Sequence, residues 1–140
     1  MKYRNILLVD DDEDDRQVFQ SVISSISKAI QCVVLGDTDI ALEKLAVREI
    51  NPDLIFLGLN TPTMDGRDFL ITVKESGNLK DIPVIVLSGS PYFHSVNETK
   101  KLGALDFIAK PGKRCLPKVI SGDRGRVFLQ CLKQPKIDSN

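Results

Sequence analysis

Five short apolar runs recur along this chain, and each of the four intervals between them holds apolar residues at helical spacing. The runs are Ile6–Val9, Cys32–Leu35, Leu54–Leu57, Pro83–Leu87 and Leu105–Ala109, the last of which is interrupted by Asp106. Short runs bounded by turn residues are typical of buried strands, and the intervening spacing of three to four residues is typical of amphipathic helices. Alternating strands and helices predict β-α-β units, a parallel sheet and helices on both of its faces. We therefore expect a doubly wound, flavodoxin-like α/β fold with five parallel strands in the order 2-1-3-4-5.

The composition of the chain argues against several classes of protein. The chain has 140 residues, 42% hydrophobic and 27% charged, and these values are typical of one soluble globular domain. Its formal net charge is zero, so the overall charge of the chain does not favour binding to nucleic acid or to an anionic membrane. Three cysteines without a C-x-x-C pair argue against a disulfide scaffold or a zinc site and favour a reducing cytoplasm. No apolar stretch is long enough for a signal peptide or a membrane span.

Polar residues stand where several of these strands end. Asp10 and Asp11 follow the first run, Ser88 the fourth and Lys110 the fifth. The carboxyl ends of parallel strands meet at one edge of the sheet, where ligands bind in this architecture. Two carboxylates, a hydroxyl and an ammonium at that edge suit a divalent cation and a phosphoryl group. The third run ends instead at Gly58, which has no side chain to react.

Each of these polar residues also has a simpler interpretation. The six consecutive acids at positions 10–15 would serve as a solvated helix start, which we favour for Glu13, Asp14 and Asp15. Taken singly, Ser88 would be a turn residue and Lys110 a surface lysine. Their common position at strand ends favours a shared site.

Four stretches of the chain resemble the motifs of response-regulator receiver domains of the CheY-like superfamily. They are Ile6–Asp11, Pro52–Pro62 together with Met64–Gly66, Pro83–Ser88 and Phe107–Pro111. The resemblance extends over residues 3–111. It implies that residues 1–140 form a single receiver domain, in which residues 112–140 are an irregular C-terminal segment with a last helix from about residue 124 to 133.

The resemblance implies a magnesium site at the end of the first strand. Asp10 and Asp11 would hold the cation, with help from the backbone carbonyl of Asn60. The family's nucleophilic aspartate falls on position 58, where this chain has Gly58. An aspartyl-phosphate cannot form on glycine, and the loss of a third carboxylate should weaken or abolish magnesium binding. A natural degenerate receiver, a deliberately inactivated variant and a sequence change at position 58 are all compatible with this sequence.

The resemblance also implies the residues around the phosphoryl group. Ser88 would contact it, Lys110 would pair with it, and Phe107 would occupy the aromatic switch position. Without an aspartate at position 58, Lys110 is expected to turn toward Asp10 or Asp11.

The resulting hypothesis is a two-component phosphorelay receiver domain that is not an enzyme and acts through protein–protein interaction. The resemblance implies a sensor histidine kinase or a phosphotransfer protein as partner. It leaves the downstream partner and a homodimer open. We expect a cytoplasmic protein without nucleic-acid or membrane partners.

Two alternatives remain at this point. One is a haloacid-dehalogenase-like, magnesium-dependent phosphohydrolase that uses Asp10 as nucleophile, because Asp10–Asp12 forms a D-x-D motif ahead of Ser88 and Lys110. That family needs a further acidic pair after the lysine, and only Asp123 and Asp138 follow Lys110. The other is a structural adaptor with vestigial acids, which a magnesium titration would distinguish.

Overall fold

The computed structural model describes residues 4–26, 28–58, 66–88 and 100–109. Their centre is a five-stranded parallel sheet in the order β2-β1-β3-β4-β5, so the predicted topology is confirmed. The strands are β1 (Asn5–Val9), β2 (Gln31–Leu35), β3 (Leu54–Gly58), β4 (Val84–Ser88) and β5 (Asp106–Ala109).

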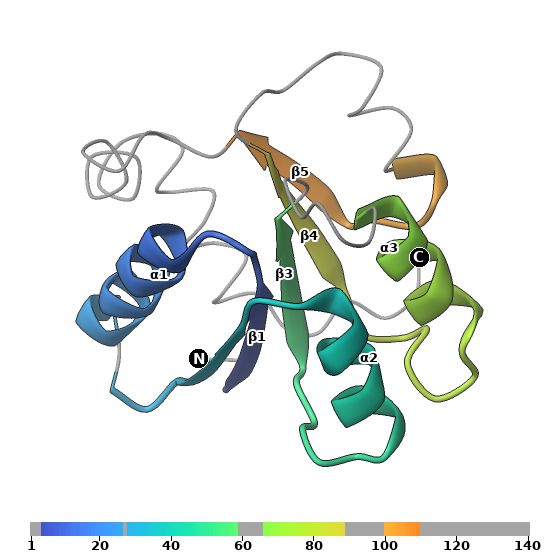
Figure 1. Cartoon of the computed structure of the whole chain (residues 1–140), viewed down its shortest axis with the longest axis horizontal. Coiled ribbons are helices and arrows are strands. Elements are labelled where there is room, and N and C mark those ends of the chain that lie inside the picture. The colour runs from blue at the N-terminus through green and yellow to red at the C-terminus, as the bar shows by residue number, and fades with distance from the viewer. Residues whose placement is uncertain (1–3, 27, 59–65, 89–99, 110–140) are drawn as a thin grey trace.

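Helices cover both faces of the sheet (Figure 1). They are α1 (Glu13–Ile26), α2 (Thr38–Ala46) and α3 (Gly66–Glu75). On the α1 face, Phe19 packs edge-on against Phe56 with the ring centroids 5.0 Å apart. On the other face, α2 and α3 bury Leu45 and Phe69 in a second core cluster. The two faces arise because successive strand residues point to opposite sides of the sheet.

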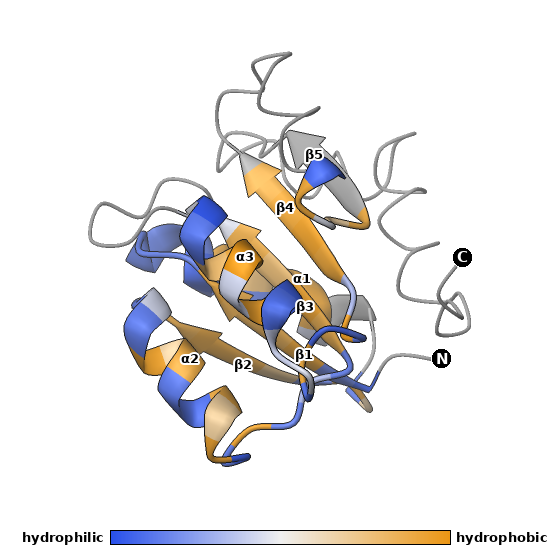
Figure 2. Ribbon diagram, turned by 90° about the vertical axis from the view of Figure 1, so that its right-hand side faces the viewer, coloured by the Kyte–Doolittle hydropathy of each residue, from blue (hydrophilic) through white to orange (hydrophobic). Residues whose placement is uncertain are grey.

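The middle of the sheet is fully buried. All five residues of β3 are buried, and Figure 2 shows the central strands in the orange of hydrophobic residues. A strand with neighbours on both edges and helices on both faces must be apolar throughout, as the run Leu54–Leu57 is. β2 forms one edge of the sheet, and its Val33 remains 40% exposed.

Two helices begin at aspartates that satisfy free backbone N–H groups. The Asp12 carboxylate accepts a hydrogen bond from the Asp15 N–H at 3.1 Å, immediately before α1. The Asp37 carboxylate accepts from the N–H groups of Asp39 and Ile40 at the start of α2. Such caps are typical N-terminal signals, and they hold each helix start beside the end of the preceding strand.

Several sequence predictions lie outside the described residues. These include Asn60, Lys110, most of the helix expected between the fourth and fifth strands, and the C-terminal segment of residues 112–140 with its last helix. Among the residues that the structure does describe, each helix is too short or too polar to cross a bilayer.

Candidate functional site

The end of β1 places a carboxylate inside the protein. Asp10 follows the last residue of the strand, and its side chain is only 1% exposed. Its backbone N–H donates to the Leu35 carbonyl at 2.9 Å, which continues the pairing of β1 with β2. Its Oδ1 accepts from the Asp12 N–H at 3.0 Å. A buried carboxylate needs such partners, because burial without them would strongly disfavour its charge.

Gly58 lies directly beside this carboxylate. Val9 and Leu57 are paired in register, so Asp10 and Gly58 are neighbours one residue further along β1 and β3. A β-carbon on Gly58 would lie 2.8 Å from Oδ2 of Asp10 and 2.9 Å from its Cγ. The Asp10 side chain therefore occupies space that any other residue at position 58 would need.

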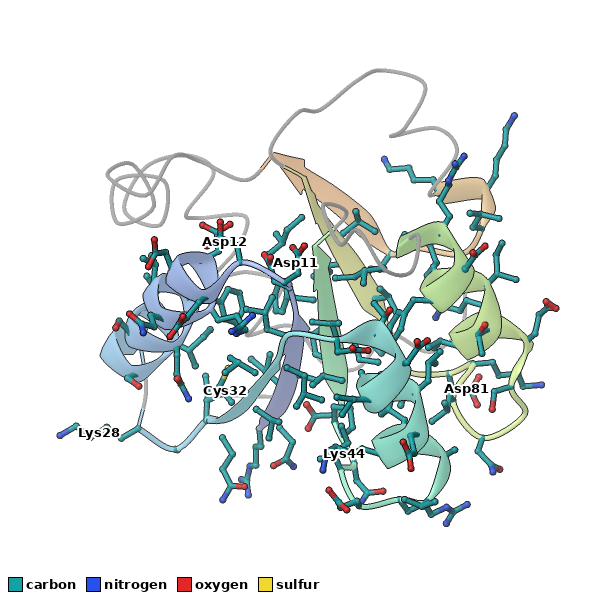
Figure 3. All side chains as sticks on the ribbon, in the orientation of Figure 1. Asp11, Asp12, Lys28, Cys32, Lys44 and Asp81 are labelled. Carbon is teal, nitrogen blue, oxygen red and sulfur yellow. The ribbon has the colours of Figure 1, made fainter. Side chains whose placement is uncertain are left out.

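Asp11 and Asp12 complete the acidic turn between β1 and α1. Asp11 is half-buried and Asp12 exposed, and Figure 3 shows both where β1 ends and α1 begins. Within the described ranges, no three His, Cys, Asp or Glu side chains gather closely enough to enclose a metal ion. Asp10 and Asp11 are consecutive residues of this turn, so they bring two carboxylates to the end of β1.

Two other predicted positions lie on neighbouring strands. Ser88 is the last residue of β4, one residue beyond Leu87, which is paired with Gly58. The backbone of Ser88 therefore reaches the same edge of the sheet. Phe107 belongs to β5, where it is paired with Val86. Asn60 and Lys110 lie outside the described residues, so their distances to this edge stay predictions.

Sequence reasoning did not identify Arg16 as part of this region. Arg16 lies in the first turns of α1, and its Nη1 donates to the backbone carbonyl of Asp10 at 2.8 Å. The same nitrogen lies 2.6 Å from where a β-carbon on Gly36 would be. One signal was available in the sequence, because Arg16 is the basic residue that directly follows the six acids.

A cavity lies at the opposite end of the sheet from these residues. Its volume is about 330 Å³, and its lining includes Asn5 and Gln31 at the starts of β1 and β2, together with Pro52 before β3. It therefore does not enlarge the acidic region at the carboxyl ends of the strands.

Comparison with known proteins gives one consistent result. Residues 6–120 match the family model described as the response regulator receiver domain. A two-component response regulator of Oryza sativa subsp. japonica, ORR5, is 36% identical over 107 residues, which span 76% of this chain and 78% of that protein.

Solved structures with the same fold include two response regulators. The Mn²⁺-bound form of Rcp1 superposes with a TM-score of 0.81 and 27% identity, covering 96% of this chain and 99% of that one. The phosphorylated cyanobacterial phytochrome response regulator RcpA gives a TM-score of 0.82 and 28% identity, covering 94% of this chain and 95% of that one.

Proposed function

The chain belongs to the response regulator receiver domain family, and from that premise we propose that it is a signalling receiver that takes no phosphoryl group at the usual position. In this proposal Gly58 stands where the family's acceptor aspartate would be. The protein then works by binding other proteins and has no enzymatic activity of its own.

One observation carries the proposal. Gly58 ends the central strand β3, and the carboxylate of Asp10 lies against the place where its side chain would start. A nucleophile at this point would need an oxygen on residue 58, and glycine supplies none. The phosphorylated RcpA has the same fold, so the fold itself accommodates a phosphoryl group.

The acids of this site fit a divalent cation. Magnesium in proteins is commonly held by one or two carboxylates, with water molecules completing the coordination. Asp10 is buried beside Gly58 and Asp11 is half-buried next to it, so both can supply oxygen from the same turn. Rcp1, which shares the fold, binds Mn²⁺, and this supports a divalent cation in the present chain. In this proposal Asp10 and Asp11 hold Mg²⁺ or Mn²⁺, with the backbone carbonyl of Asn60 as a further donor. Binding is weaker than with three carboxylates.

The other roles follow from the family. Ser88 and Lys110 would face a phosphoryl group, and Phe107 would take the aromatic switch position. A bound cation neutralises phosphoryl oxygens, and phosphorylation normally shifts a receiver between two conformations. Without an acceptor at position 58, the ratio of those conformations depends on packing and on partners that favour one of them. A sensor histidine kinase or a phosphotransfer protein is the partner class that the family suggests.

The proposal can be tested by phosphoryl transfer from a small donor. Acetyl phosphate with Mg²⁺ is added to the full chain and to its Gly58→Asp and Gly58→Asn variants, and intact mass and peptide mapping follow the label. The unchanged protein and Gly58→Asn should take no phosphoryl group, because neither has a nucleophile at position 58. Gly58→Asp should be labelled at residue 58.

The unchanged protein and the Gly58→Asp variant test different parts of the proposal. Labelling of the unchanged protein would refute the proposal, and peptide mapping would identify the acceptor. Absence of label on Gly58→Asp would show that the rest of the site, including the placement of Asp10 against residue 58, no longer supports transfer. The phosphohydrolase alternative has no supporting observation, and turnover of a generic phosphatase substrate that is lost in Asp10→Asn would be needed to revive it.

A further inference from the structure

Hydrogen bonds hold the backbone and the side chain of Asp10, and one of them comes from a side chain on α1. The backbone N–H is held by Leu35, Oδ1 by the N–H of Asp12, and the backbone carbonyl by Arg16. We propose that Arg16, seated over Gly36, is a positioning residue that sets the Asp10 carboxylate in the acidic site. The inference rests on the proposed function where it concerns cation binding.

Gly36 provides the space in which the Arg16 guanidinium lies. A β-carbon at position 36 would be 2.6 Å from Nη1 and 3.2 Å from Cζ of Arg16. Gly36 has no left-handed φ that would call for glycine, so what it supplies here is room for a close approach. A larger residue at position 36 would push the guanidinium off the end of β2 and away from the Asp10 carbonyl.

The Arg16 bond acts on the carboxylate through the backbone. The Asp10 N–H is already tied to β2, so the carbonyl bond restrains the other side of the same residue. With Oδ1 engaged by Asp12, the side chain presents Oδ2 to Gly58. Loss of the Arg16 bond lets the peptide after Asp10 rotate, and this rotation moves Asp11 and the Asp12 N–H that holds the Asp10 carboxylate.

The geometry of the guanidinium matters in addition to its charge. A hydrogen bond from a charged donor to a carbonyl is stronger than a neutral one, and Arg16 reaches the carbonyl by a side chain that is itself half-buried. Lysine would keep the charge at position 16 but not the planar group that lies over Gly36. Groups that orient metal ligands typically change metal affinity about 10–100-fold when they are removed.

The first measurement is the affinity of the full chain for Mn²⁺. Binding is detected by the paramagnetic broadening of amide signals during a Mn²⁺ titration. We expect Arg16→Gln and Gly36→Ala each to weaken Mn²⁺ binding about 10-fold. The double variant should be no weaker than either single one, because both changes remove the same contact. Arg16→Lys should recover little of the loss. Gly77→Ala is the matched control, since no atom within 4 Å meets its added carbon.

The second measurement needs no cation. Amide hydrogen exchange is measured at the Asp12 N–H, which donates to the Asp10 carboxylate. The exchange rate of this amide should rise several-fold in Arg16→Gln and in Gly36→Ala. The Asp39 N–H, which donates to Asp37 at the start of α2, is the internal reference and should not change. Equal acceleration of both amides would indicate general destabilisation and would refute a positioning role.

The outcomes separate this inference from the proposed function. If the unchanged protein binds no Mn²⁺, the proposed cation site is wrong, and the exchange of Asp12 alone decides the role of Arg16. If Arg16→Gln leaves the exchange rate of the Asp12 amide unchanged, the inference is overturned, even if the affinity for Mn²⁺ falls. Additive losses of Mn²⁺ affinity from Arg16→Gln and Gly36→Ala would likewise contradict a shared contact.

Discussion

At the scale of single residues, the site depends on how Asp10 and Gly58 share space. Oδ2 of Asp10 would be 2.8 Å from a β-carbon on residue 58, so the two positions cannot be changed independently. The sequence allowed their neighbourhood to be predicted, because both residues end adjacent parallel strands. It did not predict the contact of Arg16 with Gly36, because the path of a long side chain over a strand end leaves no periodic pattern.

The first residue-scale prediction concerns Gly58→Ala. The added carbon forces the Asp10 carboxylate to move, and such overpacking typically costs about 1–3 kcal/mol. Replacing glycine with alanine also restricts the unfolded chain, which offsets roughly 0.4–1 kcal/mol of that cost. We therefore expect a net loss in the free energy of unfolding, measured by urea denaturation. A Gly58→Ala protein as stable as the unchanged one would show that Asp10 shifts without cost.

The second residue-scale prediction concerns the thiol of Cys32 on β2. Burial raises the pKa of Cys32 from its ordinary value of 9.0 to about 11. At pH 8 the thiolate, which is the reactive form, is then about 100-fold scarcer than for an exposed thiol. Iodoacetamide followed by peptide mass analysis should modify Cys32 far more slowly in the folded protein than in urea. Equal rates in the two conditions would contradict the burial of this side chain.

At the scale of elements, α2 begins at a favourable capping residue and is followed by a residue in an unfavourable backbone conformation. It begins at Asp37, which accepts two backbone N–H bonds, and it is followed by Arg48 with a φ of 60°. The N–H of Glu49 donates to the Lys44 carbonyl at 3.0 Å, so this turn closes the helix in a left-handed conformation. The start of the helix could be predicted from Asp37. The left-handed residue could not, because glycine or asparagine is the usual signal.

The prediction for this element is that Arg48→Gly stabilises the protein. A side chain in the left-handed region costs roughly 1–2 kcal/mol, and glycine avoids this cost but loses part of the gain to its freer unfolded chain. The expected net gain is about 0.5–1 kcal/mol in the free energy of unfolding. Arg48→Ala is the control, because it removes the charge and keeps the β-carbon, so it should bring no such gain.

At the scale of the whole molecule, the sheet brings distant parts of the sequence to one edge. The apolar runs and their spacing were sufficient to predict the strand order β2-β1-β3-β4-β5, because right-handed crossovers leave few alternatives. They also placed Asp10, Gly58 and Ser88 at ends of strands that lie at one edge. The missing third carboxylate predicts a weaker affinity of that edge for a cation, but the size of the loss could not be predicted, because it depends on how the carboxylates are oriented.

The central claim is that this edge keeps its cation-binding acids and lacks the atom that would accept a phosphoryl group. Its most direct test is an amide NMR titration of the full chain, first with Mg²⁺ and then with beryllofluoride, which mimics a phosphoryl group bound to aspartate. Mg²⁺ should shift the signals of Asp10, Asp11 and Gly58, and beryllofluoride should add no further change, whereas Gly58→Asp should respond to both. A response of the unchanged protein to beryllofluoride, or none to Mg²⁺, would contradict the claim.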